Sequence, residues 1–167
     1  MNQEERHTIS ILVDNEPGVL SRVAGLFSGR GFNIASLNVA ETLESELSRI
    51  TLVSYGVAQI QEQINKQLRK LVNVVKVTDF SDSDCVEREM ALVKVQSDAE
   101  HRAEVLRIAD IFRCKVVDVS PNDYTIEVTG NRGKIEALID LLRPVGSLEI
   151  ARTGVIAMAR SKKGTKK

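Results

Sequence analysis

The first 80 residues of the chain alternate between short β-branched stretches and longer stretches with helical spacing. Residues 8–13 (TISILV) alternate in polarity, which predicts a strand. Apolar side chains then recur every three or four positions from Val19 to Phe27, which predicts a helix. Further along, the pattern predicts a hairpin, a second helix and a closing strand over residues 32–40 with 48–54, 57–71 and 72–78. This βαββαβ order is that of a ferredoxin-like domain, in which helices cover one face of an antiparallel sheet.

The same order returns in the second half of the chain. The predicted strands and helices are residues 90–95, 105–112, 116–119, 124–128, 135–142 and 148–152, with an added strand at residues 155–159 as the alternative end of the domain. Ser97 and Glu100 predict a capping box at the first of these helices. Residues 18–27 align without gaps with residues 103–112, and a coincidence between two helical patterns is the alternative to a repeat.

The two halves together predict the fold class and the domains. We expect an α+β fold of two ferredoxin-like βαββαβ domains in tandem. They cover residues 6–80 and 85–160, and a basic tail follows over residues 161–167.

Charge and aromatic content argue against nucleic-acid binding. The 167 residues carry 23 basic and 23 acidic side chains, but the last 8 residues hold 5 of the basic ones, so the rest of the chain is mildly acidic. There is no tryptophan, and the predicted strands at residues 8–13 and 48–53 carry no aromatic side chain on which bases could stack. We expect no nucleic-acid partner.

Membrane insertion, disulfides and catalysis are not indicated either. No stretch approaches the roughly 18 apolar residues of a membrane helix, and the charged start does not resemble a secretory signal, so we expect a cytoplasmic protein without membrane contact. Cys85 and Cys114 are too few for a disulfide scaffold or a four-cysteine zinc site. His7, in an irregular start, and His101, in the first turn of a charged helix, lack metal-ligand spacing. We expect no catalytic site, metal or cofactor in the chain itself.

The most informative segment joins the first strand to the first helix; it comprises residues 14–20 (DNEPGVL) and is called the entry loop below. A helix N-terminus presents unpaired N–H groups that accept a small anion such as a carboxylate. Gly18 lets a ligand approach the backbone, and the amide of Asn15 offers both a donor and an acceptor. Asn33 and Asn38 stand among apolar residues and need polar partners. These groups suit a free amino acid; the alternative is a tight turn in which Asn15 caps the helix.

The entry loop opens a longer run of residues with a familiar pattern. These residues are Asn15, Gly18, Leu20, Arg22, Val23, Gly25, Leu26, Phe27, Arg30, Gly31, Phe32, Asn33, Ile34, Ser36 and Leu37. They match N-x-x-G-x-L-x-R-V-x-G-L-F-x-x-R-G-[FY]-N-I-x-S-L, so residues 8–53 resemble an ACT domain, specifically that of the regulatory (small) subunits of acetohydroxyacid synthase, also called acetolactate synthase. Later runs (KQLRKLVNVVKV, VEREMALVKV and TGNRGKIEALIDLLRP) resemble the same family, which extends the resemblance to residues 6–160.

The resemblance implies a regulatory and non-catalytic role. Members of this family bind a separate catalytic (large) subunit, which uses thiamine diphosphate, Mg²⁺ and FAD to make acetolactate from pyruvate in branched-chain amino-acid biosynthesis. They raise its activity and confer feedback inhibition by valine. The resemblance further implies a homodimer through ACT domains at residues 6–80, with the second half serving activation. By matching position, the effector site comprises Asn15, Gly18, Val19 and Leu20 of one protomer and Asn33 and Ile34 of the other.

The residues and the resemblance lead to one hypothesis for binding. The valine carboxylate would rest on the N–H groups of Gly18 and Val19, while Asn15 would bind the ammonium or the carboxylate. Asn33 would close the site across the interface. The isopropyl group would lie against Leu20 and Ile34, a contact worth about 1–3 kcal/mol over a ligand without the methyl groups. The rival hypothesis is an ACT-type amino-acid sensor that regulates a different enzyme or a transcription factor.

Overall fold

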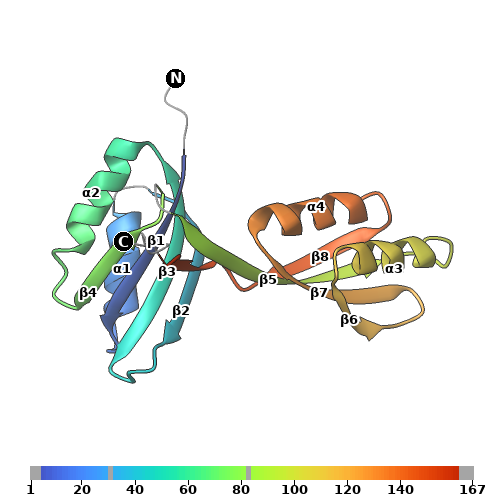
Figure 1. The fold of residues 1–167 in the computed structure, drawn as a ribbon, viewed down its shortest axis with the longest axis horizontal. Coiled ribbons are helices and arrows are strands. Elements are labelled where there is room, and N and C mark those ends of the chain that lie inside the picture. The colour runs from blue at the N-terminus through green and yellow to red at the C-terminus, as the bar shows by residue number, and fades with distance from the viewer. Residues whose placement is uncertain (1–4, 30–31, 82–83, 162–167) are drawn as a thin grey trace, which may run out of the picture. The chain divides into compact units, whose positions relative to one another are not determined.

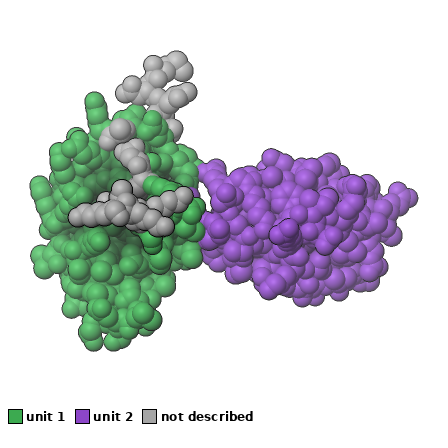
Figure 2. Space-filling view, viewed as in Figure 1, with its two compact units in different colours: residues 1–86, 155–167 green, residues 87–154 purple. Residues whose placement is uncertain are grey.

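The computed structural model describes residues 5–29, 32–81 and 84–161, which form two compact units (Figure 2). The first unit holds the described residues up to Val86 together with residues 155–161. The second unit holds Glu87–Gly154. Each unit builds its own hydrophobic core.

Both units have the same order of elements and the same sheet. The first contains β1 (Glu5–Asp14), α1 (Val19–Ser28), β2 (Ile34–Glu41), β3 (Leu47–Gly56), α2 (Ala58–Leu68) and β4 (Val74–Asp79). The second contains α3 (Arg102–Ile111), β6 (Lys115–Val119), β7 (Asp123–Gly130), α4 (Arg132–Leu142), β8 (Ser147–Arg152) and most of β5 (Cys85–Gln96). The strands lie in the equivalent antiparallel orders β2-β3-β1-β4 and β6-β7-β5-β8, and two helices cover one face of each sheet (Figure 1). The predicted fold class, two ferredoxin-like units in tandem, is confirmed.

The core of the first unit lies between its sheet and its two helices. Alternate residues of β1 and β3 point to this side, because successive side chains of a strand point to opposite faces. The buried members from the strands are Ile9, Ile11, Val13, Ile50 and Leu52. Those from the helices are Val19, Val23 and Phe27 of α1 and Ile64 and Leu68 of α2. The predicted helical spacing therefore identified the face of each helix that meets the sheet.

The second unit repeats this arrangement, but its first helix begins later than expected. The predicted capping box is wrong: the Ser97 hydroxyl donates to the Val145 carbonyl oxygen at 2.9 Å, and α3 begins only at Arg102 without a side-chain cap. Ser97 is buried beneath the turn before β8, so its hydroxyl is used by that turn and not by the helix. Asp98 instead accepts a hydrogen bond from the His101 backbone N–H at 3.1 Å.

His7 belongs to β1 and does not lie in an irregular start as expected. Its ring is only 3% exposed; Nδ1 lies 2.9 Å from the Ser81 hydroxyl and Nε2 lies 3.0 Å from the Gly56 carbonyl oxygen. Ser81 in turn donates its backbone N–H to Asp79, and Asn65 of α2 donates to the other carboxylate oxygen at 2.6 Å. The network ties the start of β1 to the ends of β3 and β4.

The carboxylate of Asp79 gives this network a pH dependence. Partial burial acts to raise its pKa, but hydrogen bonds from Ser81 and Asn65 outweigh burial and hold the pKa below its ordinary value. A lowered folded-state pKa means that the stabilisation is present above about pH 4 and is lost as the pH falls through the folded pKa. We expect Asp79→Asn to lower the free energy of unfolding by roughly 1 kcal/mol at pH 7, and by much less at pH 3.

Urea unfolding of parent and variant at pH 7 and pH 3 measures this difference. Glu62→Gln is the matched control, because the pKa of Glu62 is also lowered, by Lys66, but this carboxylate is on the surface and should contribute little at either pH. If Asp79→Asn lowered the free energy of unfolding equally at both pH values, the stabilisation would not come from the ionised Asp79 carboxylate.

The last described residues return to the first unit. The predicted C-terminal domain ran over residues 85–160, but residues 155–161, including β9 (Ile156–Ala159), pack with the first unit. β9 pairs with β5 and lies against β1. Strand periodicity shows which side of a strand is apolar and not which sheet that side will cover, so this partner had no local signal. Residues 162–167 of the predicted basic tail lie outside the described residues.

Candidate functional site

The entry loop leaves an open, uncapped helix end. β1 ends at Asp14, α1 begins at Val19, and Gly18 between them has φ 85°, in the left-handed region that favours glycine. A Cβ atom at Gly18 would meet no other atom within 4 Å, so the space in front of the helix is open. No hydrogen bond from a side chain caps α1 in the part of the chain that the structure describes.

The backbone N–H groups of this helix end are available to an anion. The first intrahelical bond runs from the Arg22 N–H to the Gly18 carbonyl oxygen at 3.0 Å. The Val19 N–H makes only a long hydrogen bond, 3.4 Å, with the Glu16 carbonyl oxygen. Because the positive end of the helix dipole also lies here, the loop can receive a carboxylate.

Asn15 does not cap the helix; its amide binds the β2–β3 hairpin. Its Nδ2 donates to the Ser45 carbonyl oxygen at 2.9 Å and to Glu41 Oε1 at 3.2 Å, and its Oδ1 accepts from the Ser48 hydroxyl at 3.0 Å. The tight-turn alternative is therefore wrong in making Asn15 the cap, although residues 17–18 do form a turn. An effector held by Asn15 would share or replace these hydrogen bonds.

The other expected site residues form two groups, one at the entry loop and one at the start of β2. Val19 is buried in the core, so only its backbone can face a ligand, whereas the Leu20 side chain is 42% exposed next to the loop. Asn33 is exposed just before β2, and Ile34, the first residue of β2, is half-buried against the core. β2 is an edge strand with β3 as its neighbour, so its outer edge carries unpaired backbone groups.

These two groups lie at opposite ends of α1. The Phe32 N–H donates to the Phe27 carbonyl oxygen at 3.1 Å, which places Asn33 beside the C-terminal end of α1. Gly18 is at the N-terminal end of this 10-residue helix. A helix of this length spans about 15 Å, far more than one amino acid covers, so one protomer cannot bring both groups onto the same small ligand.

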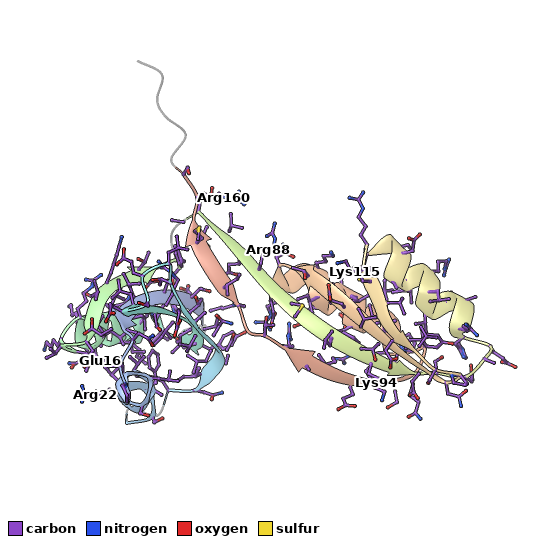
Figure 3. The ribbon with its side chains drawn as sticks, turned by 90° about the horizontal axis from the view of Figure 1, so that it is seen from below. Glu16, Arg22, Arg88, Lys94, Lys115 and Arg160 are labelled. Atoms are coloured by element: carbon purple, nitrogen blue, oxygen red, sulfur yellow. The ribbon has the colours of Figure 1, made fainter. Side chains whose placement is uncertain are left out.

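The sequence pattern missed Asn73, which holds the entry loop in place. Its Nδ2 donates to Asp14 Oδ2 and to Glu16 Oε2, both at 3.2 Å, and its Oδ1 accepts from Arg22 at 2.6 Å. Figure 3 labels Glu16 and Arg22, which lie close together at this end of the first unit. Asn73 precedes β4, more than 50 residues from the loop, so only the folded topology brings it there.

Metal-binding groups and the cysteine and histidine side chains were expected to carry no chemistry, and the structure places them as follows. No group of three or more His, Cys, Asp or Glu side chains in residues 5–29, 32–81 and 84–161 is placed to hold a metal ion. Among the described residues neither Cys85 nor Cys114 forms a disulfide, and burial raises the pKa of Cys114, which keeps its thiol protonated at neutral pH. His101 is on the surface, and its hydrogen bond with Asp98 raises the pKa of the ring. Within the same ranges, none of the helices has the length and apolar character needed to span a bilayer.

Comparison with known proteins covers both units. Residues 9–76 match the family model of the AHAS small subunit-like ACT domain, and residues 88–161 match that of the small subunit of acetolactate synthase. The acetolactate synthase small subunit of Mycobacterium bovis is 50% identical over 158 residues, which cover 95% of this chain and 94% of that protein. That of Aquifex aeolicus is 52% identical over 159 residues, or 95% and 83% of the two chains.

A solved structure agrees with the sequence comparison. The crystal structure of the acetolactate synthase small subunit from Thermotoga maritima superposes with a TM-score of 0.83 at 47% identity, and the match covers 95% of this chain and 99% of that one. With family models over both units and relatives at half identity over nearly the whole length, the chain belongs to the family of acetolactate synthase small subunits.

Proposed function

We propose that this chain activates the catalytic subunit of an acetolactate synthase and confers feedback inhibition by valine. The observation that carries the proposal is the entry loop, where Gly18 in a left-handed conformation precedes an uncapped helix and faces open space. The N–H groups and the positive dipole end of this helix suit the carboxylate of a free amino acid. The relatives named above, which are small subunits, supply the partner enzyme in this proposal.

A homodimer formed through β2 would complete the site. If a second copy lays its β2 antiparallel to this β2 about a two-fold axis, the start of one strand comes beside the end of the other. The end of β2, Glu41, is hydrogen-bonded to Asn15 of the entry loop. Asn33 and Ile34 of the partner protomer would therefore reach the entry loop that their own protomer cannot reach.

Valine would then be held by groups from two chains. Its carboxylate would rest at the N–H groups of Gly18 and Val19, with Asn15 binding an adjacent polar group. The exposed Leu20 side chain and the partner protomer's Ile34 would cover the isopropyl group. Because the ligand touches both protomers, it favours the dimer arrangement that fits it, which is the differential affinity that regulation requires.

The chemistry belongs to the partner subunit in this proposal. The catalytic subunit would carry thiamine diphosphate, Mg²⁺ and FAD, and the present chain would act in the cytoplasm without a cofactor of its own. The regulatory chain contributes its binding energy for the catalytic subunit and an equilibrium that valine shifts. The coupling free energy between valine and the catalytic subunit would be about 1–3 kcal/mol, which is typical of such systems.

Reconstitution with the cognate catalytic subunit tests the proposal. We expect no pyruvate conversion by this chain alone, faster acetolactate formation by the mixture than by the catalytic subunit alone, and loss of that gain when valine is added. Analytical ultracentrifugation of the chain should give a dimer. A catalytic subunit whose rate ignores both the chain and valine would overturn the proposed function.

A further inference from the structure

The sheet of the first unit is covered on both faces. Thr8, Ser10, Thr51 and Val53 point away from the helix-side core, since they alternate with its members along β1 and β3, and Thr8 faces Val53 while Ser10 faces Thr51. An uncovered sheet face would leave these side chains in solvent, but they are between 1% and 3% exposed. We call this side of the sheet the outer face.

The outer face is covered in part by residues 155–160, called the return segment below. Val155 and Ala157 of this segment are buried, as is Phe80 after β4, and none of the three belongs to either helix-side core. Ile156 and Met158 alternate with them and are exposed, which is the pattern of a strand lying flat on a surface.

Hydrogen bonds fix both ends of the return segment. At its start, the Val155 N–H donates to the Ser36 hydroxyl oxygen at 3.0 Å. At its end, the Arg160 N–H donates to the Asp84 carbonyl oxygen at 3.1 Å, and Arg160 Nε donates to the Asp84 carboxylate at 2.8 Å. The first of these joins the segment to β2, the strand that begins with the expected effector residue Ile34.

A β-bulge separates Ile34 from Ser36. Ile34 is opposite Ser54 and Ser36 is opposite Val53, so β2 advances by two residues where β3 advances by one, and Ala35 is the extra residue. Bulges bend a strand and redirect the side chains beside them. A ligand that contacts Ile34 therefore binds beside the bulge of an edge strand. Ser36, which accepts the hydrogen bond from Val155, is on the other side of this bulge.

Val155 is connected to the second unit by a short stretch of backbone, so a movement of Val155 would be passed on to that unit. Val155 follows Gly154, which has φ 83°, and Thr153 before it is hydrogen-bonded to Met90 of β5. The Thr153 N–H donates to the Met90 carbonyl oxygen at 3.0 Å, the Met90 N–H donates to the Thr153 hydroxyl at 3.1 Å, and that hydroxyl donates to the Met90 carbonyl oxygen at 3.3 Å. Two covalent steps thus separate the residue held by Ser36 from a fixed point of the second unit.

We propose that Ser36 is a positioning residue that couples effector binding at the start of β2 to the second unit, through its hydrogen bond to the return segment. The inference rests on the proposed function, since it needs an effector at Ile34. Ser36 does not touch the effector; it determines whether a change in β2 moves Val155. Removal of the hydroxyl should therefore separate valine binding from valine inhibition.

Three variants of the full chain test this, each assembled with the catalytic subunit. Ser36→Ala removes the acceptor, Ser36→Thr keeps a hydroxyl, and Ser10→Ala removes another outer-face hydroxyl, one that accepts from Arg49 at 3.0 Å and not from the return segment. Calorimetry with valine gives the Kd of each chain, and acetolactate formation gives its inhibition by valine. A second measurement, amide hydrogen exchange of residues 155–160 with and without valine, reports on the return segment directly.

For Ser36→Ala we expect a valine Kd within about twofold of the parent and a valine concentration for half-inhibition raised about fivefold or more. Ser36→Thr and Ser10→Ala should both behave as the parent does, and valine should alter exchange of residues 155–160 in the parent but not in Ser36→Ala. Unchanged inhibition in Ser36→Ala, an equal loss in Ser10→Ala, or no rescue by Ser36→Thr would each overturn the coupling role while leaving the proposed function standing. A parent chain that does not bind valine would instead overturn the proposed function and the coupling with it.

Discussion

Gly18→Asp should abolish valine inhibition and leave activation of the catalytic subunit largely intact. The aspartate would place a fixed negative charge where the valine carboxylate is expected, at the uncapped end of α1. Loss of charge-assisted hydrogen bonds together with like-charge repulsion should weaken valine binding by roughly 100-fold or more. Because a Cβ atom at Gly18 would meet no other atom within 4 Å, we expect the substitution to leave both cores in place. Acetolactate formation measured against valine concentration gives the result.

Gly18→Asn separates charge from backbone strain and bulk. Asparagine has nearly the same shape as aspartate, and both residues tolerate the left-handed conformation better than other residues with side chains, so each variant should lose about 1 kcal/mol or less of folding stability. Asparagine can still donate a hydrogen bond to a carboxylate, so its effect on valine binding should be clearly smaller. Full valine sensitivity of Gly18→Asp, with the variant chain confirmed in the complex, would show that the effector does not bind at this helix end.

Local patterns predicted the elements well where packing agrees with propensity. The alternation at residues 8–13 and 48–54 became the central strands β1 and β3, and the helical spacing after Val19 became α1, because each pattern needs only one apolar face buried against one partner. The repeated order of patterns was sufficient for two units of one topology. The ungapped match between residues 18–27 and 103–112 also falls on equivalent helices, α1 and α3.

The errors share one physical cause, which is a partner far away in the sequence. His7 looked like part of a charged start, but its ring is buried by Gly56 and Ser81. Ser97 looked like a helix cap, but a turn 48 residues later takes its hydroxyl. A polar residue offers a hydrogen bond to whichever group the fold brings near it, and the sequence shows only the local candidates.

The candidate site follows the same division. Gly18 could be selected from the sequence because a glycine at the start of a helix lets a ligand approach the backbone, and the structure adds its left-handed conformation. The part played by Asn15 could not be fully predicted, since its amide binds Ser45 and Glu41 of the β2–β3 hairpin. Asn73, which fixes the entry loop, had no local signal because it lies in a turn before β4.

The second large effect concerns the assignment of valine binding to the first unit and of activation to the second. The return segment belongs to the first unit, so a test by truncation must keep it. A chain ending at Ser81 lacks residues 155–160, so it would expose the part of the outer face where β1 lies against β9. Each buried Val or Phe that becomes exposed costs about 1.5–3 kcal/mol, and each lost kcal/mol lowers the Tm of a domain this small by roughly 4–8 °C. We expect this truncated chain to melt well below a version that keeps the return segment.

That version joins residue 88 to residue 155 through an Asn-Gly turn. β5 and β9 run antiparallel here, because Arg160 bonds to Asp84 at one end and Thr153 bonds to Met90 at the other, so a two-residue hairpin turn can close the gap left by the second unit. The closed first unit should bind valine by calorimetry about as tightly as the full chain, since the entry loop and β2 are intact. The increase in catalytic activity that it produces should be at most about one tenth of the increase produced by the full chain, because activation is assigned to the second unit. If the closed unit activates as well as the full chain, activation belongs to the ACT unit; if it is folded and dimeric yet gives no heat with valine, the effector site needs residues of the second unit.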